Sequence, residues 1–285
     1  MKIVKRLPGR IFNLYAQINV SPLNNLIHLG SKYSGYYVPD NYLNTSSICY
    51  CVGAGVDISL DVELATNYGA QVFVFDPMPY ALDHFNELVN KTSKGQQLAI
   101  GTGEHAYVYK INGEQLKTIQ FVKTGVWDEK KLLKFYSPAT QNYAGHSITN
   151  LQNTDQYIEA PVDTLVNIMQ KLGHSHIDLL KIEIEGAEYT VIDNVLNDKI
   201  DVKIILVEFD EFYHRKGKNL ATLRRIKKSS DKLLKAGYKL VHTVSYCKKV
   251  FVRDDIFEML DNRDNRSKGV LEPQQRRLET TGTAG

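Results

Sequence analysis

The chain of 285 residues carries a formal net charge of +3, and 43% of its residues are hydrophobic and 24% charged. This composition is typical of a globular protein with a substantial core, and the small net charge argues against nucleic acid as the main partner. No apolar run approaches the roughly 20 residues of a membrane-spanning helix, and three cysteines without metal-ligand spacing favour a reducing compartment. We therefore expect a cytoplasmic protein that binds neither nucleic acid nor membranes.

The first 45 residues lack a regular hydrophobic period, so we expect an N-terminal cap. From residue 46 to residue 258, strand-like runs alternate with helix-like segments, which predicts one α/β domain with a mostly parallel sheet covered on both faces. The expected strands are Ile48–Val52, Gln71–Phe75, Ile119–Val126, Ile177–Glu183, Lys203–Phe209, Tyr238–Thr243 and Lys248–Arg253. The expected helices are Val56–Tyr68, Pro79–Lys91, Asp163–Leu172, Ala187–Leu196 and Leu220–Ala236.

Other segments depart from this alternation. Thr92–Lys117 is interrupted by glycines and is expected to be a surface insertion or hairpin. Leu133–Tyr136 and Tyr157–Val162 look like two short extra strands, and the loop QNYAGHSITN between them is a candidate lid. The basic run RRIKKSSDKLLK in the last helix is interpreted as a solvated face, with a polyanion site as the alternative. Residues 259–285 are expected to form a polar, disordered tail.

The segment CVGAGVDISLD joins the first of these strands to its helix. Gly53 and Gly55 lie at the carboxyl end of the strand, where glycine allows close approach of a ligand and where open α/β sheets bind ligands. Ile58 stands where a dinucleotide fingerprint has its third glycine, which counts against a nicotinamide or flavin cofactor. Asp76 follows Gly55 at about the 20 residues typical of an acid that binds ribose hydroxyls. S-adenosylmethionine, which has a ribose but no pyrophosphate, fits this combination.

Charged residues gather at the ends of two later strands. Lys181, Glu183 and Glu185 alternate with apolar residues, whereas a central parallel strand is expected to be apolar on both faces. Glu208 and Asp210 follow the apolar run of the next strand. The functional interpretation is that Glu183 and Glu208 converge on a substrate hydroxyl or on a divalent metal ion. A chance arrangement of charged strand ends is the alternative.

Two further pairs are candidates for ligand contact. Asp57 and Asp61 lie in the first turns of a helix, where the macrodipole stabilises acids, and Asp57 is also placed to face a sulfonium. His146 and Ser147 lie in the candidate lid loop, where an ordinary surface role is the alternative for the histidine. Together with two acids from the charged strand ends, the loop residues make up the candidate substrate-binding set: His146, Ser147, Glu185 and Asp210.

The linked order of several segments resembles the FkbM-type S-adenosylmethionine-dependent methyltransferases. The resemblance covers roughly Ser47–Val252 and runs through GAGVDISLD, FDPMP, TGVWDEKKLLKFYSP, GHSI, APVDTL, IDLLKIEIEGAEYTVIDNVL, ILVEFDE and AGYKLV. It implies a Rossmann-like class I methyltransferase fold with a seven-stranded, mostly parallel sheet whose last strand is reversed. It also implies methyl transfer to a hydroxyl oxygen of a sugar, a glycan or a small molecule.

The resemblance assigns roles to individual residues as well. The implied cofactor residues are Gly53, Ala54, Gly55 and Asp57 for the amino-acid part, Asp76 with Pro77 for the ribose, and Gly125, Val126 and Trp127 for the adenine. Glu183 stands where most members have aspartate.

Our mechanistic hypothesis makes Glu183 the base, with Glu208 as its partner or as a second metal ligand and Lys181 tuning both. Val56 and Cys51 stand where many family members have acids. One alternative is therefore a catalytically silent binding protein with the methyltransferase fold. The other alternative is an NAD-dependent oxidoreductase on a Rossmann fold, against which Ile58 counts.

Overall fold

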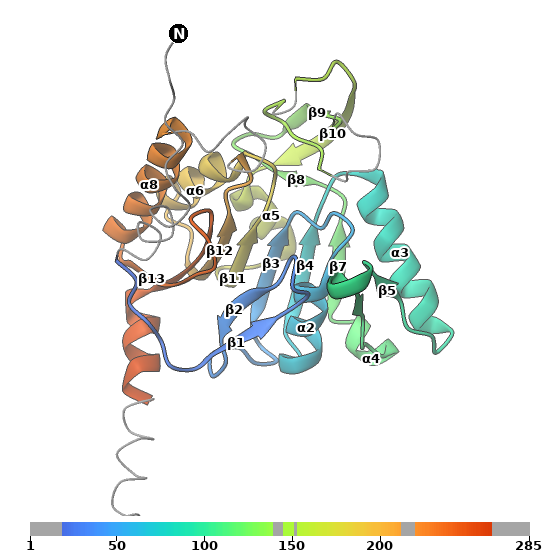
Figure 1. Ribbon diagram of the computed structural model, residues 1–285, viewed down its shortest axis with the longest axis horizontal. Helices are drawn as coiled ribbons and strands as arrows, with labels where there is room; N and C mark the ends of the chain where they lie inside the picture. Colours follow the sequence, from blue (N-terminus) through green and yellow to red (C-terminus); the bar gives the residue numbers. More distant parts are fainter. Residues whose placement is uncertain (1–18, 139–144, 151–152, 212–219, 264–285) are drawn as a thin grey trace, which may run out of the picture.

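The computed structural model describes residues 19–138, 145–150, 153–211 and 220–263 (Figure 1). Its central sheet has seven strands, in the spatial order β13 (Tyr238–Thr243), β14 (Lys248–Arg253), β12 (Val202–Glu208), β11 (Ile177–Ile182), β3 (Ile48–Val52), β4 (Gln71–Phe75) and β7 (Ile119–Val122). The strands from β12 to β7 pair in parallel, and β14 runs antiparallel to both of its neighbours. The expected fold class, including the reversed strand, is confirmed.

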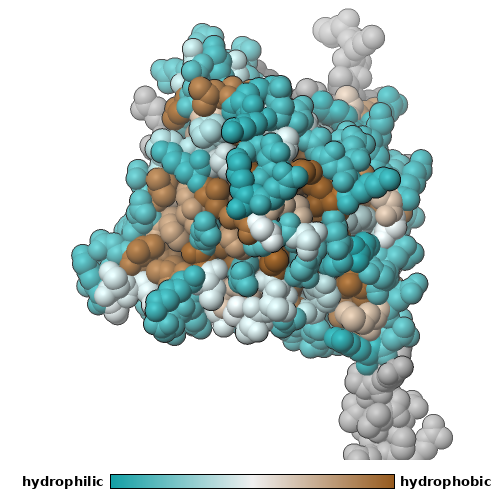
Figure 2. Space-filling view, turned by 180° about the vertical axis from the view of Figure 1, so that it is seen from behind, coloured by the Kyte–Doolittle hydropathy of each residue, from teal (hydrophilic) through white to brown (hydrophobic). Residues whose placement is uncertain are grey.

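Helices cover both faces of this sheet because its central strands are apolar on both sides. Cys49 and Cys51 of β3 belong to the core that includes α2 (Ser59–Tyr68) and α3 (Pro79–Ser93). The alternating Tyr50 and Val52 belong to the opposite core, with α5 (Leu165–Leu172), α6 (Glu188–Asn197) and α8 (Leu220–Lys235). None of the helices in the described ranges is long and apolar enough to span a membrane. The surface seen from behind carries apolar residues in its middle with hydrophilic residues around them (Figure 2), as is ordinary for globular proteins.

The strand expected at Ile119–Val126 is in fact two strands, so this prediction is wrong. The backbone N–H of Thr124 turns back to the carbonyl of Val122 at 2.7 Å, which ends β7. The chain then forms β8 (Gly125–Val126), which pairs with β10 (Tyr157–Asp163), and β10 pairs antiparallel with β9 (Lys131–Tyr136). The two extra strands of the sequence prediction are therefore present, in a small three-stranded sheet β8-β10-β9.

Two hairpins complete the domain. The segment after α3 forms β5 (Ala99–Ile100), the short 3-10 helix η1 (Gly103–His105), β6 (Tyr107–Val108) and α4 (Gly113–Leu116), which confirms the expected hairpin. In the N-terminal cap, β1 (Leu26–Leu29) pairs antiparallel with β2 (Tyr36–Pro39). The cap is attached to α2 because the N–H of Ser31 donates to Ser59 Oγ at 2.7 Å.

The expected boundaries of the cap and the tail concern residues that the structure describes only in part. Residues 1–18 lie outside the described residues, as do residues 264–285 of the tail. Residues 254–263 form a helix in which Leu260 is only 5% exposed against the core. The boundary expected at residue 259 therefore falls inside a packed helix.

Candidate functional site

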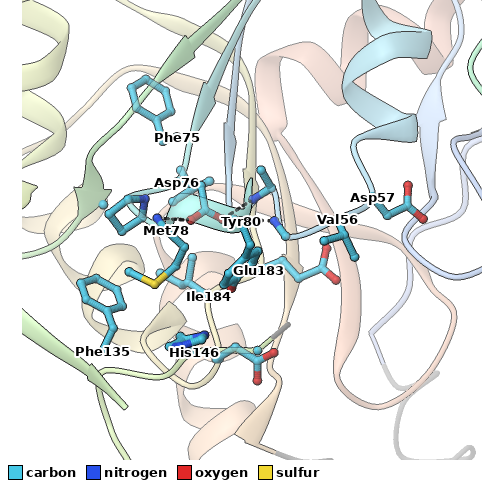
Figure 3. Close-up of a pocket in the computed structure, with 18 of the residues that line it drawn as sticks. Val56, Asp57, Phe75, Asp76, Met78, Tyr80, Phe135, His146, Glu183 and Ile184 are labelled. Carbon is cyan, nitrogen blue, oxygen red and sulfur yellow. Dashed lines mark hydrogen bonds between the residues drawn. The ribbon is translucent and has the colours of Figure 1, made fainter. Parts of the chain in front are cut away.

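A cavity of about 300 Å³ opens at the carboxyl edge of the central strands. Its walls are the turns after β3, β4 and β11, together with β8, β9 and parts of the cap and of the candidate lid loop (Figure 3). Ligands of open α/β sheets bind at this edge, and small-molecule sites measure about 300–1,000 Å³. We call this space the first cavity.

The glycine loop contacts the end of β11 directly. A Cβ on Gly53 would lie 1.8 Å from the backbone oxygen of Glu183, and the φ angle of Gly53 is +91°. Gly55 also has a positive φ, +52°, but no atom lies within 4 Å of the place of its Cβ. Glycine is therefore needed at position 53 for close approach as well as for backbone conformation. This approach brings Glu183 beside the loop.

The carboxylate of Asp76 holds the glycine loop in place (Figure 3). Its Oδ2 accepts hydrogen bonds from the backbone N–H groups of Ala54 at 3.0 Å and Gly55 at 3.1 Å, and its Oδ1 accepts one from Met78 at 2.9 Å. Burial raises the pKa of Asp76, although these N–H donors oppose the shift. A carboxylate has about four lone-pair sites, so Oδ1 retains one for a ligand hydroxyl.

Lys181 is a buried cation, 2% exposed, at the back of the first cavity. Its Nζ donates to the backbone oxygen of Gly53 at 2.8 Å and lies 3.2 Å from Glu183 Oε2. Burial alone would lower the pKa of Lys181, but the carboxylates of Glu183 and Asp61 outweigh burial and raise it. The ammonium therefore remains charged and fixes the position of Glu183.

A strained turn follows β11. Glu185 has a φ of +55°, which is costly for any residue other than glycine. Asp210 Oδ2 accepts from the N–H of Glu185 at 3.2 Å, and Ser147 Oγ donates to its carbonyl at 2.7 Å. Glu188 accepts from two further N–H groups of the turn, and burial raises the pKa of Glu188 to about 8. Burial also raises the pKa of Asp210. These side chains hold the turn that presents Glu185 to the cavity.

Asp57 joins the glycine loop to the cap. Its Oδ1 accepts from the N–H of Ser59, two residues further along the chain, at 3.0 Å, as in an Asx turn. Its Oδ2 accepts from Ser31 Oγ at 2.6 Å. The cap is thereby held beside the loop, and it contributes Tyr33 and Ser34 to the first cavity.

The structure brings most of the predicted site residues together. The first cavity is lined by Gly53, Ala54, Gly55, Asp57, Asp76, Pro77, Gly125, Val126, Lys181, Glu183, Glu185 and His146. Ser147 and Asp210 lie behind its wall, where they hold the Glu185 turn. Trp127 lines a neighbouring cavity.

Glu208 is not among the described residues that line the first cavity, and it pairs with Lys248, whose Nζ is 2.8 Å from Glu208 Oε2. The antiparallel register of β12 and β14 places these two residues opposite each other. Glu183 likewise has an ammonium partner in Lys181. Within the described part of the chain, no group of three or more His, Cys, Asp or Glu residues is arranged to hold a metal ion. The hypothesis that Glu183 and Glu208 share a metal ion is therefore not supported.

Several residues that line the first cavity were not predicted from the sequence. Tyr80 lies near His146, with ring centroids 5.4 Å apart, and Phe135 comes from β9. Burial lowers the pKa of His146, which keeps its ring uncharged. Tyr80 follows the DPMP segment closely and could have been inferred from it. Tyr33, Ser34 and Phe135 reach the cavity from distant segments that show no such signal.

The sheet order, the reversed strand and the cavity at the glycine loop define a Rossmann-like protein of the class I methyltransferase type. A family model described as the methyltransferase FkbM domain matches residues 52–240, and the chain belongs to this family. It is similar to the crystal structure of methyltransferase FkbM from Methylobacillus flagellatus KT, at 12% identity and a TM-score of 0.43, over 74% of this chain and 44% of that chain. The present chain thus spans less than half of that protein. No curated protein matches the chain.

The close approach at Gly53 predicts a difference between two substitutions. Gly53→Ala is expected to lower the free energy of unfolding by more than the roughly 1–3 kcal/mol of backbone strain alone, because its Cβ meets the Glu183 carbonyl. Gly55→Ala, which meets no atom within 4 Å, is expected to cost only about 1–2 kcal/mol. Urea unfolding measures both, and equal losses would show that the approach to Glu183 is unimportant.

Proposed function

We propose that the chain is an S-adenosylmethionine-dependent methyltransferase that methylates a hydroxyl oxygen of a sugar, a glycan or another small molecule. The observation that carries the proposal is that the glycine loop, Asp76 and Glu183 all line one cavity at the carboxyl edge of the sheet. Membership of the FkbM family supports methyl transfer as the reaction.

The charges of the first cavity suit a cationic donor. Among the residues that the structure describes, its lining includes the acids Asp57, Asp76, Glu183 and Glu185 but only one ammonium or guanidinium group, that of Lys181. The sulfonium and ammonium groups of S-adenosylmethionine would be attracted to such a lining. The remaining lone pair of Asp76 Oδ1 would accept from a ribose hydroxyl, and apolar Val126 and Met78 would border the adenine. The residues therefore fit this donor, which needs no pyrophosphate site.

Glu183 is the residue best placed to act as base. S-adenosylmethionine supplies, when bound, a methyl carbon that an oxygen can attack in line. The carboxylate of Glu183 would take the proton of the acceptor hydroxyl as the new C–O bond forms and the C–S bond breaks. Lys181 orients Glu183 through the 3.2 Å ion pair. The loop from Gly145 to Ile148 contributes to holding both reactants in the first cavity, where alignment itself favours displacement.

We place this activity in the cytoplasm. Cys49, Cys51 and Cys247 are all buried and free. Burial raises the pKa of Cys51, which keeps its thiol protonated and unreactive. Buried thiols of this kind suit a reducing compartment.

Binding of the donor tests the proposal directly. Isothermal titration calorimetry is expected to show binding of S-adenosylmethionine and S-adenosylhomocysteine and none of NAD. Binding of NAD alone would replace the proposal by an oxidoreductase. Binding of none of the three would identify a catalytically silent protein with this fold.

Substitutions at Asp76 and Glu183 are expected to separate binding from catalysis. Asp76→Ala removes the acceptor for the ribose and the loop, and should weaken S-adenosylhomocysteine binding by about tenfold or more. Glu183→Gln should leave this binding within about threefold but lower methyl transfer to a panel of hydroxylated compounds by about 100-fold.

Asp76→Asn is the matched control, because its amide oxygen can still accept from the loop while the negative charge is lost. It should bind S-adenosylhomocysteine better than Asp76→Ala. Equal weakening of binding by Asp76→Ala and Glu183→Gln would show that the two roles are assigned wrongly.

A further inference from the structure

A second cavity, of about 400 Å³, adjoins the first. At three places in the chain, one residue lines the first cavity and the next residue lines the second cavity. These places are residues 126–127, 148–149 and 185–186. Consecutive Cα atoms are about 3.8 Å apart, so the two cavities share a wall that is one residue thick. The two cavities therefore lie next to each other.

Hydrogen bonds hold this shared wall. The carbonyl of Glu185 accepts from Ser147 Oγ at 2.7 Å and from Thr149 Oγ1 at 3.4 Å. The backbone N–H of Trp127 donates to the carbonyl of Asp163 at 2.9 Å. Asn194 Nδ2 donates to the carbonyl of Trp127 at 3.4 Å. The second cavity is thus built on the elements that form the first.

One face of α8 lines the second cavity with cations. The lining residues of α8 each lie three or four positions along the helix from another of them, so they lie on the same face: Arg225, Lys228, Ser229 and Lys232. The basic run interpreted from the sequence as a solvated face therefore lines a cavity on one side. α8 and α6 contact each other (Figure 1), and α6 contributes Asp193, the only acid among the described residues that line the second cavity.

The cations that line the second cavity outnumber the carboxylates that pair with them. Lys232 pairs with Asp193 at 2.5 Å, and Arg225 pairs with the buried Glu211. Lys228 has no carboxylate within ion-pair distance among the residues that the structure describes. The residues with hydroxyl groups that line the same space are Thr149, Thr190, Ser229 and Tyr189, and Trp127 and Tyr189 contribute aromatic rings.

We propose that the second cavity binds a phosphate ester carried by the methyl acceptor, so that the acceptor is a phosphorylated hydroxy compound such as a sugar phosphate. A phosphate takes several charge-assisted hydrogen bonds from arginine and lysine. Two of the three cations are paired with the carboxylates of Asp193 and Glu211, and Lys228 with the hydroxyl groups of Thr190 and Ser229 offers donors in addition to these pairs. The rings of Trp127 and Tyr189 provide an apolar wall for the carbon skeleton. The acceptor would extend over the edge of the shared wall, so that its hydroxyl lies beside Glu183 in the first cavity.

This inference rests on the proposed methyl transfer, but its first test does not need turnover. Inorganic phosphate is titrated into the protein at constant ionic strength, with chloride as the balancing anion. Lys228→Gln is expected to weaken phosphate binding by about fivefold or more, since it removes an unpaired cation. Lys227→Gln is the matched control, because Lys227 pairs with Asp231 and does not line the cavity. It should change binding less than about twofold.

Binding of S-adenosylhomocysteine is measured on the same samples. Phosphate binding that is absent, or equally weakened by both substitutions, would overturn the inference, and intact S-adenosylhomocysteine binding would then leave the methyltransferase proposal standing. Lost S-adenosylhomocysteine binding with selective phosphate binding would instead overturn the proposed function. Acetate that binds as tightly as phosphate would overturn the phosphate assignment.

Turnover supplies the second test. Pairs of compounds, each as a phosphate ester and as the free alcohol, are offered with a labelled methyl donor. The esters should have KM values at least about tenfold lower than the alcohols, and Lys228→Gln should remove most of this preference. Preference for the free alcohols would contradict the inference.

Discussion

The rest of the site depends on the interactions of the buried Lys181 ammonium. It lies on β11, in the middle of the sheet, where a cation requires partners to remain charged. Its partners are the carbonyl of Gly53 in the glycine loop and the carboxylate of Glu183 after the strand. Asp61, on α2, adds a further negative charge nearby. Loss of this ammonium would leave the carboxylates of Glu183 and Asp61 without their cation and would remove one of the contacts that hold the loop to the strand end.

The same interaction bears on the two departures from the family pattern. Cys51 has no charge to offer Lys181, but Asp61 is fully buried, and the charges of Asp61 and Lys181 act on each other's pKa. Asp61 on α2 is thus an acid near Lys181, although burial raises the pKa of Asp61 against the effect of the ammonium. Val56 is 48% exposed at the edge of the first cavity.

The sequence was sufficient for the fold because period and turn signals agree along the chain. β3, β4, β13 and β14 have the bounds expected from their apolar runs. The sequence also located the carboxyl edge, since parallel strands end on one side. It could not show the break between β7 and β8, which depends on pairing with the distant β10. Nor could it show that Glu208 faces Lys248, because register across β12 and β14 decides that contact.

A crystal structure with S-adenosylhomocysteine bound would test the central claim most directly. The account predicts the nucleoside in the first cavity, with a ribose hydroxyl within hydrogen-bond distance of Asp76 Oδ1 and the sulfur on the side of Glu183. A nucleoside in the second cavity, or one in the first cavity with its ribose away from Asp76, would contradict it.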